Sequence, residues 1–306
     1  TITRILIVKW SAMGDVTLAS AAIEDVRLAF PEAQIDLDIL PPWNQLYAAD
    51  TRFHMVHTYP LRSKKTIKRW RASVNWLKAM AQRRYDLILD LQTTDRSRLM
   101  IGLLHLLGRG AAYRAGNKPA WPYNLAPHHS GGASHALDMA RATIGAAGIQ
   151  GVTEHPILHT TPAQRDRSKA LLERHDLESG HFAMFLPGSQ AGGYLKRWGA
   201  SRYATLAQSL LATGIAHVAV VGGPDEIEEC ARICELADDE RVINLCGQTA
   251  PMDVPLIAAE TKFIIGNDTG TAHLAAAGLR PLIVICGPTD PRRVLPAGPH
   301  VHGMQL

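Results

Sequence analysis

Short apolar runs alternate along the first half of the chain with longer segments of helical periodicity. The run at 5–8 is typical of a buried strand, and the segment 16–30 repeats apolar residues every three or four positions, as an amphipathic helix does. Further strands are expected at 35–40 and 87–89, and a helix over the basic segment 63–83. Repeated strand–helix units of this kind predict a parallel sheet that is covered by helices on both faces.

The alternation pauses near residues 150–165, where Gly151, Pro156 and Pro162 interrupt it, and then begins again. The expected elements of the second half are helices at 164–175, 202–213, 227–236 and 254–260, and strands at 182–186, 217–221, 242–244, 263–265 and 282–285. Two runs of strand–helix units predict an α/β protein with two Rossmann-like domains and mainly parallel sheets. We place the domains at residues 1–160 and 161–306.

The composition suits a globular protein, with 46% hydrophobic and 20% charged residues and no apolar run long enough to span a bilayer. Residues 1–8 resemble a first strand more than a signal peptide, so a cytoplasmic location is expected, with association at a membrane surface left open. The four cysteines form no zinc-ligand pattern. The Asp36-Leu37-Asp38 triplet resembles a metal-binding DxD motif, but we interpret it as the half-exposed polar face of a strand and predict no metal site.

Basic residues are concentrated in one segment, although the net charge is only +4. Residues 62–84 contain no Asp or Glu. Their basic residues are Arg62, Lys64, Lys65, Lys68, Arg69, Arg71, Lys78, Arg83 and Arg84. Such a segment is either a solvated helix face or a site for an anionic partner, which could be acidic lipid headgroups, a phosphorylated glycan or nucleic acid. Trp70 and Trp76 lie between the charges, which would suit a membrane interface as well as nucleic acid.

Polar loops follow several predicted strands, at the positions where open α/β sheets bind ligands. The chain has no GxGxxG motif, which disfavours a dinucleotide-dependent dehydrogenase. The loop KWSAMGD ends at Asp15, where a helix N-cap is expected. Asp15 is therefore either a structural cap or a general base for a hydroxyl group.

Two loops of the second half carry residues suited to a nucleotide. PGSQAGGYLKRW is rich in glycine and holds Lys196, which could close over phosphates, with Ser189 as a hydroxyl donor. The loop lacks P-loop spacing, and an ordinary surface loop is the alternative. GGPDE ends at Glu226, which is either a ribose-binding carboxylate or an acid at the start of a helix.

The stretch GNDTGTAHLAAA joins a predicted strand to an alanine-rich helix. We expect Asp268 or Thr269 to cap this helix and Gly270 to let a ligand approach the backbone. The amide groups from Thr269 to Thr271 should point outward, with His273 one turn further along. Together these groups predict a diphosphate site, and a capped structural helix is the alternative.

Six motifs resemble, in order and spacing, those of the glycosyltransferase family 9 heptosyltransferases. They are RILIVKWSAMGDV, LPGSQAGGYLKRW, VVGGPDE, LCGQT, FIIGNDTGTAHLAAA and GPTDPRR. The resemblance implies a GT-B fold, in which two Rossmann-like domains face each other. It also implies inverting, metal-independent and cofactor-free transfer of a heptose from ADP-heptose to the inner core of lipopolysaccharide.

The resemblance also implies roles for individual residues. Asp15 matches the family's proposed base, Lys196 the lysine at the donor phosphates, and Glu226 the acid near the ribose. In the last long motif, Asp268 matches a residue near the sugar, and Thr269, Gly270 and His273 match residues near the diphosphate. We include Ser189 and Thr271 in the expected donor site. Two features depart from the family pattern: Gly199 stands where a proline is expected, and the chain ends at Leu306, before a further helical segment that members usually have.

The expected partners are therefore an ADP-sugar donor and a phosphorylated glycolipid acceptor, with no nucleic acid. The candidates for holding the acceptor are Lys64, Lys65, Lys68 and Arg69. A location at the cytoplasmic face of the inner membrane is left open. Two other functions stay open for this fold. One is a nucleotide-sugar epimerase or hydrolase, and the other is a module that binds a nucleotide sugar without catalysis.

Overall fold

The computed structural model describes the chain except for residues 60–65, 93, 128–134, 190–192 and 306. Its contacts divide the chain into two compact units, Thr1–Thr153 and Glu154–Leu306. This division lies a few residues before the boundary that we placed after residue 160.

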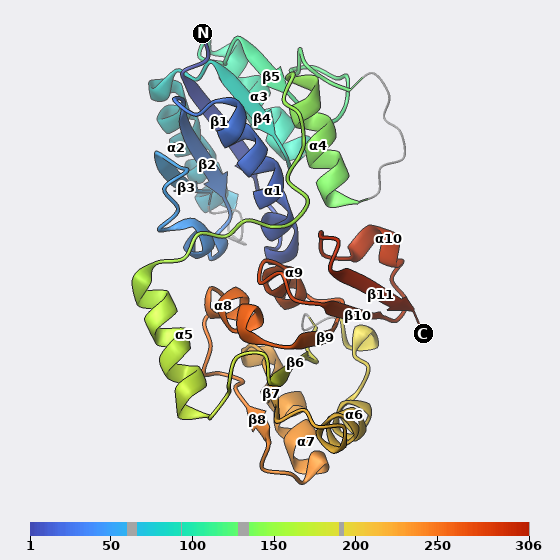
Figure 1. The fold of residues 1–306 in the computed structure, drawn as a ribbon. Helices are drawn as coiled ribbons and strands as arrows, with labels where there is room; N and C mark the ends of the chain where they lie inside the picture. The colour runs from blue at the N-terminus through green and yellow to red at the C-terminus, as the bar shows by residue number, and fades with distance from the viewer. Residues whose placement is uncertain (60–65, 93, 128–134, 190–192, 306) are drawn as a thin grey trace. The chain divides into compact units, whose positions relative to one another are not determined.

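A five-stranded sheet forms the centre of the first unit, in the order β3-β2-β1-β4-β5 (Figure 1). The strands are β1 (Arg4–Lys9), β2 (Gln34–Ile39), β3 (Met55–Thr58), β4 (Leu87–Asp90) and β5 (Tyr113–Ala115). All neighbouring pairs are parallel. Ile5, Leu6 and Ile7 of the central strand are fully buried, because helices cover both faces of such a sheet.

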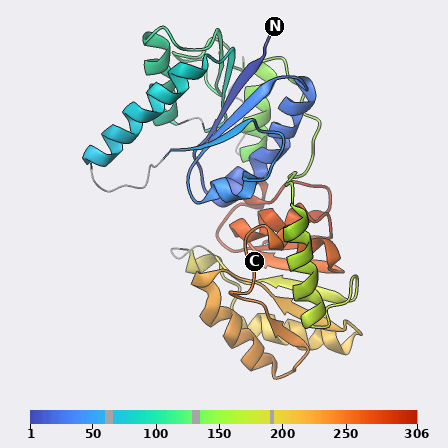
Figure 2. The same cartoon turned by 90° about the vertical axis from the view of Figure 1, so that its left-hand side faces the viewer.

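The helices of the first unit form two layers. They are α1 (Met13–Ala29), α2 (Thr66–Arg83), α3 (Asp95–Leu106) and α4 (Ala136–Ala146), with a short 3₁₀ helix, η1 (Trp43–Tyr47). Helices α2 and α3 pack on the face of the sheet that carries Leu6, Val8 and Ile88. Helices α1 and α4 pack together on the other face, as Figure 2 shows.

A six-stranded parallel sheet forms the centre of the second unit, in the order β11-β10-β9-β6-β7-β8. Its strands are β6 (Phe182–Leu186), β7 (His217–Val220), β8 (Val242–Asn244), β9 (Phe263–Asn267), β10 (Leu282–Cys286) and β11 (Val301–Gln305). Its helices are α5 (Pro162–Arg174), α6 (Ala200–Ala212), α7 (Ile227–Ala237), α8 (Asp253–Glu260), α9 (Gly270–Ala276) and α10 (Pro291–Val294), with 3₁₀ helices η2 (Tyr194–Lys196) and η3 (Pro224–Glu226). Numbered from β6, this is the Rossmann strand order 3-2-1-4-5-6 read from the other edge.

The two sheets confirm the predicted α/β class. Each sheet also contains one point where the direction of strand addition reverses, between β1 and β4 in the first unit and between β6 and β9 in the second. Ligands of open α/β sheets bind beyond the carboxyl ends of the strands at such a point. The segments that follow β1, β4, β6 and β9 are therefore the places to look for a functional site.

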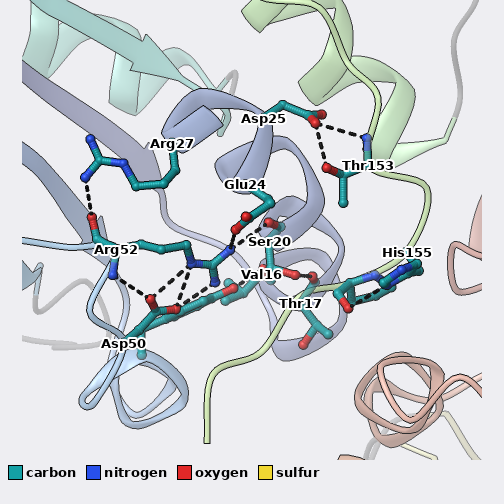
Figure 3. A network of polar contacts seen from close by, with 12 residues as sticks. Val16, Thr17, Ser20, Glu24, Asp25, Arg27, Asp50, Arg52, Thr153 and His155 are labelled. Carbon is teal, nitrogen blue, oxygen red and sulfur yellow. Dashed lines mark hydrogen bonds and ion pairs between the residues drawn. The ribbon is translucent and has the colours of Figure 1, made fainter. Parts of the chain in front are cut away.

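Helix α1 is held in the first unit by buried polar contacts (Figure 3). The Arg52 guanidinium lies 2.6 Å from a carboxylate oxygen of Asp50 and 2.8 Å from one of Glu24 on α1. Further along α1, the Asp25 carboxylate accepts hydrogen bonds from the Thr153 amide, at 3.0 Å, and the Thr153 hydroxyl, at 2.6 Å. These contacts fix the helix that carries Asp15 near its start.

Replacing Arg52 by methionine should destabilise the first unit by about 3–5 kcal/mol, because the buried Asp50 carboxylate would lose its cation. Urea denaturation followed by circular dichroism measures the change. The control is Arg98→Met, which removes an exposed pair with Asp95 and should cost less than about 1 kcal/mol. Equal losses for the two variants would contradict a structural role for the Arg52 network.

Candidate active site

The carboxyl end of β9 is tied to the loop that follows β6 through one buried side chain. The Asn267 amide nitrogen donates to the Pro187 carbonyl oxygen at 2.5 Å, and its carbonyl oxygen accepts from the Tyr203 hydroxyl at 3.0 Å. Asn267 is fully buried. Sequence reasoning did not single it out, although its place directly before Asp268, at a strand end, was a usable signal.

Lys196 and Asp268 form an ion pair at this edge of the second sheet. The Lys196 Nζ atom lies 2.6 Å from Asp268 Oδ2, and the Lys196 amide donates to the Gly193 carbonyl oxygen at 2.8 Å. The Asp268 side chain is 8% exposed and that of Lys196 is 33% exposed. An ammonium group has three N–H donors, so this pair leaves donor capacity on the exposed side of Lys196.

The turn after β9 presents backbone amides at the start of α9. Thr269 is in the N-cap position with an extended backbone, and its side chain makes no capping bond. Within the described part of the chain, the amides of Thr269, Gly270 and Thr271 donate no hydrogen bond, as expected for the first turn of a helix. The prediction that Asp268 or Thr269 caps this helix is confirmed for Thr269 as the N-cap residue, although the cap has no side-chain hydrogen bond. Asp268 is paired with Lys196 instead. His273 is buried on the same helix.

Ser189 and Arg197 support the glycine-rich loop from within. The Ser189 hydroxyl donates to the Gly193 carbonyl oxygen at 2.9 Å and accepts from Arg197 Nε at 3.3 Å. Ser189 is fully buried. These contacts position the segment that carries Lys196.

Glu226 lies over the ends of β6 and β7. Its carboxylate accepts a hydrogen bond from the Gly223 amide, and a Cβ atom added to Gly188 would come within 2.3 Å of Glu226 Cγ. Only glycine at position 188 leaves room for this side chain. Burial raises the pKa of Glu226, against the opposing effect of the Gly223 amide.

In the first unit, Asp15 is in the first turn of α1 but does not cap it. The N-cap residue is Ala12, so the predicted N-cap position of Asp15 is wrong by three residues. The Ser11 hydroxyl donates to Asp15 Oδ2 at 2.5 Å. The Asp15 side chain is partly exposed, which leaves it accessible for proton transfer.

Lys9, the last residue of β1, is buried near the carboxylates of Asp15 on α1 and Asp90 at the end of β4. Lys9 Nζ donates to the Leu91 carbonyl oxygen at 3.0 Å, and the Tyr123 hydroxyl donates to Asp90 Oδ2 at 2.5 Å. Burial lowers the pKa of Lys9, while the negative charges of Asp15 and Asp90 oppose this shift. Sequence reasoning missed Lys9 and Asp90, although each is the last residue of its strand.

Both acids of the DxD triplet are buried, so our interpretation of a half-exposed strand face is wrong. Asp36 accepts from the Tyr85 hydroxyl at 2.6 Å, and Asp38 accepts from Trp10 Nε1 at 2.9 Å and from Trp76 Nε1. Burial raises the pKa of Asp38 to about 6, against the two indole hydrogen bonds. Because Trp10 directly follows β1, Asp38 anchors the start of the loop that leads to Asp15.

Of the basic segment, the expected acceptor residues Lys64 and Lys65 lie outside the described residues. Lys68 and Arg69 fall within α2, but their side chains are not described. The two tryptophans of the segment differ: Trp70 is 67% exposed, whereas Trp76 is a core residue at 5%.

The described ranges of the chain contain no group of three or more His, Cys, Asp or Glu side chains that could hold a metal ion. They also contain no helix with the length and apolar character needed to cross a bilayer.

The chain is an α/β protein with two units, each built on a parallel sheet. Polar and cationic side chains lie at the carboxyl edge of the second, Rossmann-type sheet. Residues 74–306 match the model of glycosyltransferase family 9 (heptosyltransferase), and the chain belongs to this family. It is thus a glycosyltransferase, as the sequence motifs predicted.

Relatives with assigned functions extend over most of the chain. Lipopolysaccharide heptosyltransferase 1 of Escherichia coli K12 is 27% identical over 94% of this chain and 89% of its own length. Lipopolysaccharide heptosyltransferase 2 of the same strain is 25% identical over 94% of this chain and 84% of its own length.

Solved structures confirm the fold. The glycosyltransferase family 9 protein of Veillonella parvula superposes with a TM-score of 0.83 at 19% identity, over 99% of this chain and 86% of that one. The E. coli heptosyltransferase WaaC with ADP gives 0.72 at 23% identity, over 99% and 93%. The predicted GT-B fold class is therefore correct.

The pKa of Asp38 predicts a specific pH dependence of stability. An exposed aspartate has a pKa of 3.8, so the proton on buried Asp38 adds stability that is fully present below 3.8 and is lost as the pH rises through about 6. Relative to Asp38→Asn, the unfolding free energy of the wild type should fall by about 3 kcal/mol across this window. Urea denaturation between pH 4 and about pH 7 measures it. A constant difference between the two proteins would contradict the raised pKa.

Proposed function

We propose that this protein is an inverting, metal-independent transferase that moves a heptose from ADP-heptose to the inner core of lipopolysaccharide. The observation that carries the proposal is the Lys196–Asp268 ion pair directly before residues 269–271, whose amides donate no hydrogen bond within the part of the chain that the structure describes. Relatives named as lipopolysaccharide heptosyltransferases support it, as do solved WaaC structures that contain ADP and ADP-2-deoxy-2-fluoro heptose.

The donor diphosphate would bind at the start of α9. Departure of ADP leaves negative charge on the diphosphate, so the transition state needs cations and N–H donors more than a general acid. Lys196 supplies the cation, and its pair with Asp268 ties the ammonium group to the residue that precedes Thr269 and Gly270. Thr271 and His273 complete the phosphate side of this donor site.

The nucleoside would bind toward the ends of β6 and β7. Glu226 offers a carboxylate there that can accept hydrogen bonds from the ribose hydroxyl groups. Its Gly223 hydrogen bond and its packing over Gly188 fix the orientation of the carboxylate. Ser189 serves the same site by holding the loop that carries Lys196.

Asp15 would act as the base. In this proposal the acceptor hydroxyl attacks the anomeric carbon from the side opposite the leaving diphosphate. Asp15 takes the hydroxyl proton, since its partly exposed carboxylate can accept a proton from a hydroxyl group within hydrogen-bond reach. The in-line attack inverts the anomeric centre.

The acceptor phosphates would bind the basic segment that includes Lys64, Lys65, Lys68 and Arg69. An acceptor built on a lipid would place the enzyme at the cytoplasmic face of the inner membrane. The positive charge of this segment matches both the phosphates and an anionic membrane surface.

Replacing Asp15 by asparagine should lower the transfer rate by roughly 10²-fold or more while donor affinity stays unchanged, because only proton removal is lost. ADP release with and without an acceptor glycan measures the rate, and calorimetry measures the affinity. Asp138→Asn is the matched control, because Asp138 is an exposed acid in the first turn of α4. Acceptor-independent ADP release would instead indicate a hydrolase or epimerase, and an unchanged rate would contradict the role of Asp15.

Replacing Lys196 by methionine should weaken ADP binding by about 10-fold or more, since the diphosphate would lose a cation and meet the unpaired Asp268 carboxylate. Adding Asp268→Asn should recover part of the lost affinity, because it removes that repulsion. Calorimetric titration with ADP measures both variants. Lys169→Met, at an exposed pair on α5, is the control. Unchanged ADP affinity in Lys196→Met would exclude the proposed donor site.

A further inference from the structure

Helix α3 has apolar side chains on both of its faces. Ser97, Met100, Ile101 and Leu104 are buried on the side that packs into the first unit. Leu99, Leu103 and Leu106 lie on the opposite side and are 55%, 36% and 70% exposed, because positions i, i+4 and i+7 share a helix face. A surface helix ordinarily carries polar residues on its outer face, so this leucine row is unusual.

Two further exposed side chains extend the row. Leu107, directly after the helix, is 60% exposed. The Trp121 ring packs against α3 at Gly102, where an added Cβ atom would come within 2.4 Å of the ring, and the side chain is still 55% exposed. Gly102 adjoins Leu103 in the chain and lies one turn from Leu99 and Leu106. We call Leu99, Leu103, Leu106, Leu107 and Trp121 the leucine face.

The segment that carries the leucine face is rich in basic residues. Asp95 is the one acidic residue in the sequence from 95 to 121. The basic residues of this segment are Arg96, Arg98, Arg109, Arg114 and Lys118. Asp95 is already paired with Arg98 at 3.1 Å. Arg114 is buried on backbone carbonyl groups. Among the residues that the structure describes, Arg96, Arg109 and Lys118 form no ion pair.

This charge pattern selects the partner. A symmetric contact between two copies of the chain would bring the same cations against each other, which costs free energy. A membrane surface with acidic headgroups offers negative charge at the rim and an apolar interior beneath the leucines. Exposed leucines with an interfacial tryptophan and basic residues are the composition of a helix that lies in a membrane interface.

We propose that the leucine face of α3 docks the protein reversibly on an anionic lipid bilayer. The four leucines and Trp121 enter the headgroup region, and Arg96, Arg109 and Lys118 contact lipid phosphates. This inference deepens the proposed function and rests on it in one respect, since an acceptor anchored in lipid explains why the enzyme would need this surface.

The test is binding of the full chain to vesicles of phosphatidylcholine with and without about one-third phosphatidylglycerol, followed by sedimentation. The variant replaces Leu99, Leu103 and Leu106 together by serine. The wild type should bind the anionic vesicles at least about 10-fold more tightly than this triple variant, and raised salt should weaken its binding. Leu28→Ser is the control, because Leu28 is a comparably exposed leucine on α1, at 59%.

Three outcomes would overturn the proposal: no binding of the wild type to anionic vesicles, equal binding by the triple variant, or equal loss of binding in Leu28→Ser. If sedimentation velocity shows a dimer that the triple variant dissociates, a second copy of the chain covers the leucine face instead. The urea midpoints of all variants should match the wild type, because the replaced leucines are exposed. Transfer to a delipidated acceptor should be unchanged in the triple variant, so failure of the docking proposal is distinguishable from failure of the transfer proposal.

Discussion

The parallel direction of every strand is the constraint on which the rest of this structure depends. Because all strands of a sheet run the same way, all their carboxyl ends meet at one edge, and each next helix begins there. At that edge of the second sheet, Asn267 joins the ends of β6 and β9 through its buried amide. At the same edge, the ion pair between Lys196 and Asp268 joins two loops that are distant in sequence.

Each unit uses a lysine and carboxylates at its strand switch point, but the two arrangements differ in exposure. Lys9 is buried beside Asp15 and Asp90, so its charge acts on neighbouring groups and not on solvent. Lys196 is partly exposed, so its ammonium group can reach a ligand. The first arrangement holds its charged groups within the unit, whereas the second suits the binding of an anion.

Strong apolar periodicity made the strands of the second unit predictable. Strands β6 to β10 match the expected segments within two residues, because each is a short buried run between turn residues. Helix α3 was not predicted, because apolar side chains on both of its faces hide the helical periodicity of the sequence. Strand β11, with exposed residues at 302–305, carries no buried-strand pattern at all. The motif residues at 15, 196 and 268 could be found from the sequence, whereas the contacts of Asn267, Lys9 and Asp38 depend on tertiary packing.

The central claim is that a donor diphosphate binds the amides at the start of α9. Hydrogen exchange at the amides of residues 269–271, measured with and without ADP, tests it most directly. These amides should exchange rapidly in the free protein, where they donate no hydrogen bond to another described residue, and slow by about 10-fold or more when ADP binds. Unchanged exchange at these amides under conditions where ADP is bound would contradict the account.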